Sequence, residues 1–172
     1  MKRHYTDKEI NELLKQLTII VDSREQVNGH VTGYFDKCKV AHTTRKLETG
    51  DYSAMIGDMT LEHDVVVERK ANLDEIAGNF TVDRQRFEDE FIRAKAEGLK
   101  VFLLIENASW EKILLHDYRS KLAPKSLIAS LLSWQVRFNI TIIFCKPNET
   151  GQIIHGILYY AAREALKKGE IA

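Results

Sequence analysis

The apolar residues of this 172-residue chain follow two different periods, and the order of the two predicts the fold. Short runs rich in β-branched residues are typical of buried strands. Such runs cover Leu17–Val21, Lys39–Thr44, Leu47–Met55, Met59–Lys70, Lys100–Glu106 and Ile140–Cys145. Gly57 and Asp58 predict a hairpin turn before the fourth of these strands.

Helical spacing of apolar residues separates the later strands from one another. It covers Met1–Gln16, Val82–Glu97, Pro124–Phe138 and Thr150–Lys168, with a turn or two of helix around Val31 and Phe35. Asn72 followed by Glu75 has the form of a capping box, which predicts another helix start. Strands that come first as a meander and then alternate with helices predict an α/β sandwich with a mixed central sheet.

Composition is typical of a globular chain, with 44% hydrophobic and 29% charged residues. Because one core commonly holds about 100–200 residues, we expect a single domain over residues 1–172, with residues 1–16 as a helical lead-in. No apolar run approaches the ~18 residues that span a bilayer, and the charged N-terminus is no signal peptide, so we expect an intracellular protein. Cys38 and Cys145 lack the spacing of a disulfide framework or a zinc site.

The 25 basic and 25 acidic residues cancel in total but not locally. Residues 47–76 carry a net charge of −6, whereas residues 112–146 carry +5. Carboxylates in one region and cations in another suit a protein that holds a divalent metal ion and also binds a polyanion. Ordinary scatter of surface charge is the alternative, and the charges alone do not decide between the two.

Ionisable residues share one face at the end of a strand that otherwise looks buried. Because side chains alternate along a strand, Glu68 and Lys70 point to one face and Arg69 to the other. Burying such groups costs free energy unless they are paired or bind a metal ion. Asp51 lies on the preceding strand, after Gly50, which permits a bend or bulge. The pattern therefore predicts that Asp51 and Glu68 meet at one edge of the sheet.

These residue types have the chemistry of metal-assisted phosphodiester hydrolysis. Mg²⁺ prefers oxygen ligands and is commonly held by one or two carboxylates plus a substrate phosphate. A neighbouring lysine can orient the attacking water or neutralise the transition state. Asp22, Arg24 and Glu25, which end the first strand, are natural additions to this edge. Each piece alone also fits a plainer interpretation, such as a turn or, for Asp74, a partner of the helix dipole.

The order of these motifs resembles the nuclease domain of the XPF-type structure-specific endonucleases, which belong to the restriction-endonuclease-like superfamily. The resemblance rests on Gly50–Asp51, Glu68–Lys70, Asp74, Asp22–Glu25, Phe80–Phe91, Leu104–Glu106 and Tyr118–Ser126. It covers about residues 17 to 165 and is nearest to the compact bacterial and phage branch, which would place the protein in the cytoplasm of a bacterium or a phage-infected host cell.

This resemblance implies a restriction-endonuclease-like three-layer sandwich and an endonuclease that uses Mg²⁺, or Mn²⁺ as a substitute. It implies that Asp51 and Glu68 are metal ligands, that Lys70 serves the water and the transition state, and that Arg69 supports the site or its phosphate. The residues that would complete the catalytic site are Asp22, Arg24, Glu25 and Asp74, with Asp22 and Glu25 as further metal ligands.

Candidate DNA contacts are basic residues near helix starts, where backbone N–H groups also favour phosphate. They are Arg84, Arg86, Arg119, Lys121 and Lys125. Long members of the family carry C-terminal helix-hairpin-helix motifs or a helicase region, and neither occurs in this sequence. We expect branched, flap or fork DNA in repair or recombination as the substrate, selected by the nuclease domain itself or by a partner.

The last two helices carry more apolar residues than one buried stripe needs, so a homodimer is plausible. No membrane and no nucleotide cofactor are expected. Two other functions stay open. The first is a non-catalytic DNA-binding or scaffolding subunit, against which the intact acidic residues count. The second is a small-molecule phosphohydrolase, for which the sequence offers neither a glycine-rich phosphate loop nor a nucleophile arrangement.

Overall fold

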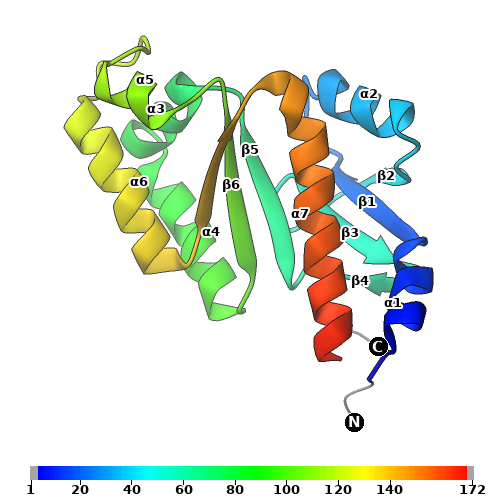
Figure 1. The fold of residues 1–172 in the computed structure, drawn as a ribbon. Helices are drawn as coiled ribbons and strands as arrows, with labels where there is room; N and C mark the ends of the chain where they lie inside the picture. Colours follow the sequence, from blue (N-terminus) through cyan, green and yellow to red (C-terminus); the bar gives the residue numbers. More distant parts are fainter. Residues whose placement is uncertain (1–3, 170–172) are drawn as a thin grey trace.

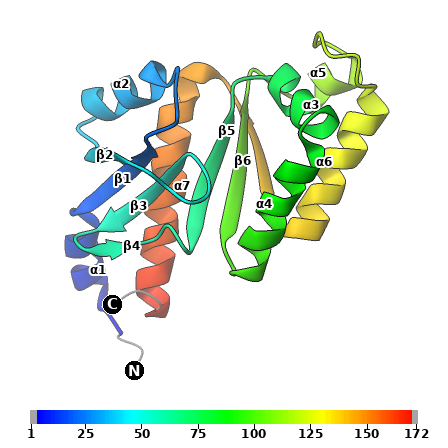
Figure 2. The same ribbon diagram turned by 180° about the vertical axis from the view of Figure 1, so that it is seen from behind.

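A computed structural model describes residues 4–169 and shows a mixed seven-stranded sheet with helices on both faces (Figures 1 and 2). The strands are β1 (Leu17–Asp22), β2 (His42–Arg45), β3 (Tyr52–Ile56), β4 (Met59–Thr60), β5 (Val65–Lys70), β6 (Lys100–Glu106) and β7 (Thr141–Cys145). Their order across the sheet is β2-β1-β3-β5-β6-β7, and β4 pairs with β3. β3 runs antiparallel to β1, β4 and β5, while the β1–β2, β5–β6 and β6–β7 pairs are parallel.

Helices form a layer on each side of this sheet, which confirms the predicted three-layer α/β class (Figures 1 and 2). The layer beside β1 and β3 contains α1 (Asp7–Leu14), α2 (Gly29–Lys37) and α7 (Pro147–Lys168). The opposite layer contains α3 (Leu73–Thr81), α4 (Arg84–Ala96), α5 (Trp110–Leu114) and α6 (Pro124–Phe138). Within residues 4–169, no helix has the length and apolar character needed to cross a bilayer.

β5 takes part in both hydrophobic cores because its side chains alternate between the two faces. Val65 and Val67 pack in the core under α7, whereas Val66 packs in the core under α3, α4 and α6. The same alternation carries on past the valines. Glu68 and Lys70 therefore follow Val66 toward α4, and Arg69 follows Val67 toward α2 and α7.

The prediction of one continuous strand over Met59–Lys70 is wrong for residues 61–64, which lie between β4 and β5. Residues 61–64 form a turn, in which the Val65 N–H donates to the Leu61 carbonyl at 2.9 Å. Leu61 is only 1% exposed, because the turn inserts its side chain into the core under α7. The single predicted strand is thus divided between two strands and a turn in which Leu61 is buried.

Other element ends also differ from the predictions. β3 begins at Tyr52 instead of Leu47, because Leu47 is buried in a loop where its N–H donates to Asp22 Oδ2 at 2.7 Å. β2 begins at His42 because Lys39 has a positive φ of 56°. α7 begins at Pro147, a residue that suits the first turn of a helix. α5, which Ser109 caps, was not among the predicted elements. The helix predicted over Met1–Gln16 is shorter among the described residues, where α1 covers Asp7–Leu14. Residues 1–3 of that prediction lie outside the described residues.

Candidate active site

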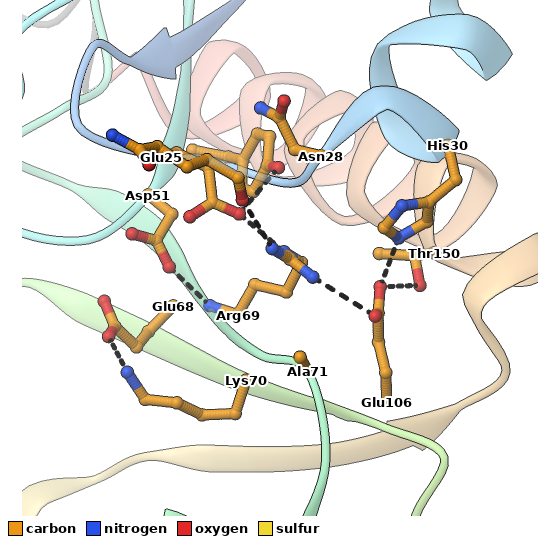
Figure 3. A network of polar contacts seen from close by, with 12 residues as sticks. Glu25, Asn28, His30, Asp51, Glu68, Arg69, Lys70, Ala71, Glu106 and Thr150 are labelled. Carbon is orange, nitrogen blue, oxygen red and sulfur yellow. Dashed lines mark hydrogen bonds and ion pairs between the residues drawn. The ribbon is translucent and has the colours of Figure 1, made fainter. Parts of the chain in front are cut away.

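Asp51 and Glu68 come together through the pairing of β3 with β5. Tyr52 is the register partner of Val67, so Asp51 stands opposite Glu68 on the antiparallel strand. Residues directly opposite each other share a face of the sheet. Figure 3 shows the two carboxylates side by side. The Arg69 N–H fixes Asp51 further by donating to its Oδ2 at 2.7 Å.

Gly50 creates the turn that brings Asp51 to this position. Its φ is +76°, in the left-handed region that favours glycine. A Cβ at Gly50 would lie 2.7 Å from the Cβ of Val66 on β5, which is far inside van der Waals contact. The close approach of the two strands at the site therefore depends on the missing side chain, and the positive φ agrees with the bend that the sequence pattern allows at Gly50.

The surroundings of Asp51 disfavour its negative charge. Burial raises the pKa of Asp51 well above its usual range, and the charges of Glu68 and Glu25 raise it further. The Arg69 N–H and the Lys70 ammonium act in the opposite direction but do not outweigh them. A divalent cation beside Asp51 and Glu68 would reverse this balance, because it stabilises ionised carboxylates.

Lys70 is held as an ammonium ion against Glu68. Its Nζ lies 2.6 Å from Glu68 Oε1 and 3.7 Å from Glu75 Oε1, and it stands 4.9 Å from the ring centroid of Phe87. Burial lowers the pKa of Lys70, but the neighbouring carboxylates outweigh burial and the net pKa is raised. Lys70 can therefore donate hydrogen bonds and supply positive charge, whereas an uncharged amine that acts as a base is disfavoured.

Arg69 lies on the other face of β5, in a buried network behind the carboxylates (Figure 3). Its guanidinium donates to Glu25 Oε1 at 2.5 Å and to Glu106 Oε2 at 3.1 Å. Glu106, at the end of β6, is 3% exposed and also contacts His30 of α2 at 2.7 Å and Thr150 of α7 at 2.6 Å. The network connects β6, the loop after β1 and two helices to the strand that carries Glu68 and Lys70.

Asp22 has partners of its own at the end of β1. Its carboxylate accepts bonds from the Arg24 N–H and guanidinium, at 2.7 and 2.9 Å, and from the Leu47 N–H at 2.7 Å. Burial opposes the charge, but these bonds outweigh burial and lower the pKa of Asp22. Its backbone N–H donates to the Asp51 carbonyl at 2.8 Å, so Asp22 lies next to the site while its oxygens hold the loop.

Glu25, unlike Asp22, contributes to the raised pKa of Asp51 through its charge. Its Oε1 accepts bonds from Arg69 and from the Tyr52 hydroxyl at 3.2 Å, and its charge contributes to the raised pKa of Asp51. Glu25 therefore belongs to the network behind the site, and its predicted role as a metal ligand stays a prediction.

Asp74, in the first turn of α3, holds the loop that follows α5. Its Oδ1 accepts bonds from the N–H groups of Arg119 and Ser120, at 2.8 and 2.7 Å. The Arg119 side chain is 91% exposed, and Lys121 and Lys125 are also exposed. This loop lies at the same end of the sheet as the ends of β5 and β6 (Figures 1 and 2).

The other two predicted DNA contacts lie on α4. Arg84 pairs with Glu88 one turn later, at 3.1 Å. Arg86 is exposed and lines a pocket of about 180 Å³ beside Glu68 and Lys70. The other lining residues are Asn79, Asp83, Phe87 and Glu90. Neither Asn79 nor Glu90 is predicted from the sequence, although Glu90 falls four residues after Arg86 on the same face of α4.

The donor chemistry of the site fits a hard divalent cation with an incomplete protein shell. Across residues 4–169, no group of three or more His, Cys, Asp or Glu side chains is close enough to hold a metal ion. Mg²⁺ often keeps several waters and takes only one or two carboxylates from the protein. Asp51 and Glu68 match that pattern.

Comparisons with known proteins identify the fold and the family of this chain. Among solved structures, XPF from Aeropyrum pernix is 21% identical with a TM-score of 0.66, and XPF from Aeropyrum pernix in complex with DNA is 21% identical with a TM-score of 0.63. Each match covers 86% of this chain and 66% of that chain, so this chain spans just under two thirds of their length. No curated protein matches the chain. The model of the ERCC4 domain matches residues 21–157, most of the chain, and the protein therefore belongs to the ERCC4 domain family.

Proposed function

We propose that this protein is a metal-dependent DNA endonuclease that hydrolyses phosphodiester bonds, with Mg²⁺ or Mn²⁺ as its cofactor. The observation that carries the proposal is the position of Lys70, 2.6 Å from Glu68, beside a second carboxylate from the paired strand, Asp51. Membership of the ERCC4 domain family supports the same chemistry.

In this proposal Asp51 and Glu68 hold the metal ion. The bound ion would polarise the scissile phosphate and lower the pKa of the attacking water. The Arg69 N–H keeps Asp51 in place through its bond of 2.7 Å, and the buried bonds of Arg69 to Glu25 and Glu106 fix the strand from behind. Lys70 remains protonated and stabilises the negative charge that develops on the phosphate.

DNA is the proposed partner because a solved structure with the same fold, XPF from Aeropyrum pernix, is a complex with DNA. The exposed side chains of Arg119, Lys121 and Lys125 supply positive charge at the site end of the sheet. We propose branched, flap or fork DNA as the substrate. Leu132 and Val136 on α6 are 47% and 84% exposed, which supports the proposed homodimer.

The test is cleavage of labelled single-stranded, duplex, flap, fork and four-way DNAs, with Mg²⁺, with Mn²⁺ and with chelator. We expect Asp51→Asn, Glu68→Gln and Lys70→Ala each to lower the rate by about 10²–10³-fold or more, because each removes charge from the reacting centre. Asp58→Asn is the matched control, because Asp58 lies exposed in the turn between β3 and β4.

If the protein cleaves none of these DNAs with either metal ion, the proposed endonuclease activity is rejected. Binding without cleavage, unaffected by chelator, would favour the alternative of a scaffolding subunit. A Lys70→Ala variant with full activity would remove the role proposed for Lys70 and leave the carboxylates as the catalytic centre.

A further inference from the structure

Within residues 4–169, two side-chain oxygen acceptors in the pocket beside Glu68 and Lys70 receive no hydrogen bond. Both lie on the side of the pocket formed by α3 and α4. Asn79 on α3 and Glu90 on α4 line this pocket opposite Glu68 and Lys70 of β5. Asn79 Oδ1 is buried and has no hydrogen-bond partner. In the part of the chain that the structure describes, no hydrogen bond or ion pair reaches the half-buried carboxylate of Glu90.

Acceptors of this kind need an explanation, because a buried oxygen without a donor costs free energy. Asp83 and Arg86, which line the pocket with them, are exposed and can be hydrated by bulk water. Asn79 Oδ1 is buried beside the pocket and has no donor among the described residues, so a donor must come from a group bound there, with the Asn79 amide turned toward it. A bound group that carries donors into the pocket would satisfy both acceptors.

Glu90 lines the same pocket as Glu68, and the charges of the two carboxylates interact. Burial raises the pKa of Glu90 and the charge of Glu68 raises it further, whereas the charges of Lys70, Arg93 and Arg86 lower it without outweighing burial. Glu90 is therefore held as a carboxylate close to the proposed metal ligand Glu68, without a hydrogen-bond donor of its own in the described part of the chain.

We propose that Asn79 and Glu90 bind the water molecules carried by the metal ion on Asp51 and Glu68. This inference rests on the proposed function, because it needs that ion. A hard cation with few protein ligands keeps several waters, and each water has O–H groups to donate. The pocket of about 180 Å³ is far larger than the ~10–15 Å³ that one water needs. Carboxylate and amide oxygens are suitable acceptors for these donors.

The experiment measures Mn²⁺ binding to the full chain, without DNA, by titration calorimetry and by the relaxation enhancement of water protons. Loss of a residue that supports a metal site from outside its ligands typically weakens affinity about 10–100-fold. We expect about 10-fold weaker binding for Glu90→Gln and for Asn79→Ala, with a changed relaxation enhancement. Asn79→Asp keeps an acceptor oxygen and should bind Mn²⁺ at least as tightly as the wild type.

Asp89→Asn is the matched control, because Asp89 precedes Glu90 on α4 and, within residues 4–169, its side chain accepts a hydrogen bond only from Gln85, at 2.8 Å. It should leave Mn²⁺ affinity unchanged. If Glu90→Gln and Asn79→Ala both bind Mn²⁺ with wild-type affinity and unchanged relaxation enhancement, the inference is overturned while the proposed function stands. If the wild type itself binds no Mn²⁺, the proposed function fails and the inference fails with it.

Discussion

At the scale of single residues, two aspartates near the same sheet edge have opposite electrostatic environments. Asp22 receives hydrogen bonds from Arg24 and Leu47, and its pKa is lowered. Asp51 receives one backbone bond and faces Glu68, and burial together with that charge raises its pKa. One carboxylate therefore stabilises the fold, whereas the other is held at a cost until a cation binds.

Replacing Asp51 should consequently stabilise the metal-free protein. A raised pKa means that the folded state holds the proton more tightly, so the free energy of unfolding decreases as pH rises through the folded pKa. At pH 8 in chelator, Asp51→Asn should therefore melt at a higher temperature than the wild type. It should also lose most of the stabilisation that Mn²⁺ gives the wild type, because binding to the folded state alone is stabilising.

Asp22→Asn is the matched comparison and should lower the free energy of unfolding, whereas Asp51→Asn should raise it. Its lowered pKa contributes stability above its ordinary pKa, and this stability is lost as pH falls through the folded value. The amide cannot accept all the bonds that the carboxylate accepts, so we expect a loss of about 2–3 kcal/mol at neutral pH. Thermal melts of both variants in chelator are the measurement. Destabilisation of both by similar amounts would contradict this account of Asp51.

At the scale of elements, strand alternation correctly predicted which side chains lie together at the end of β5. Glu68 and Lys70 lie on one face of β5, with Asp51 opposite on β3. This placement follows because side chains alternate along a strand and because the early strands form a hairpin meander. These features are local in sequence or belong to neighbouring strands. The turn at residues 61–64 was missed because the flanking residues 59–60 and 65–67 predict strand, and only the structure shows Leu61 buried in the core.

Partners that are distant in sequence could not be predicted. Arg69 and Glu106 are 37 residues apart, and His30 and Glu106 are 76 apart. Their contact depends on the parallel pairing of β5 with β6 and on the packing of α2, which no local pattern specifies. Asn79 and Glu90 were missed for a related reason, since only the angle between α3, α4 and β5 turns them toward one pocket.

The bond between α3 and the loop after α5 is a further consequence of packing, and it gives a prediction for DNA binding. Asp74→Asn should loosen the loop that carries Arg119, because an amide cannot accept from two N–H groups as well as a carboxylate. We expect about 3–10-fold weaker binding of flap DNA, corresponding to about 1 kcal/mol. Fluorescence anisotropy in chelator is the measurement.

Asp117→Asn is the control for charge in this experiment. Asp117 is exposed in the same loop, and its substitution also removes one negative charge. If charge alone decides affinity, both variants should bind DNA more tightly than the wild type. If the loop must be held, only Asp117→Asn should bind as tightly or more tightly. Tighter binding by Asp74→Asn would therefore contradict the role of Asp74 as a tether.

At the scale of the whole molecule, a net charge of zero limits nonspecific attraction to DNA. The charges are arranged in space, with exposed cations on the loop after α5 and carboxylates between β3 and β5. Affinity should therefore depend on a few phosphate contacts at one end of the sheet. α1 lies at the opposite end (Figure 1) and should not take part.

The salt dependence of binding tests this arrangement, because each phosphate neutralised by a cation adds about −0.9 to the slope of log K against log salt concentration. Arg119, Lys121 and Lys125 are three exposed cations on or next to the loop, so replacing all three with glutamine should make the slope less negative by about 3, and Lys121→Gln alone by about 1. Lys8→Gln on α1 is the control and should leave the slope unchanged. Anisotropy titrations of flap DNA in chelator across a range of salt concentrations give these slopes. A triple variant with the wild-type slope would show that DNA lies elsewhere on the molecule, and an equal effect of Lys8→Gln would show that the attraction comes from the total charge.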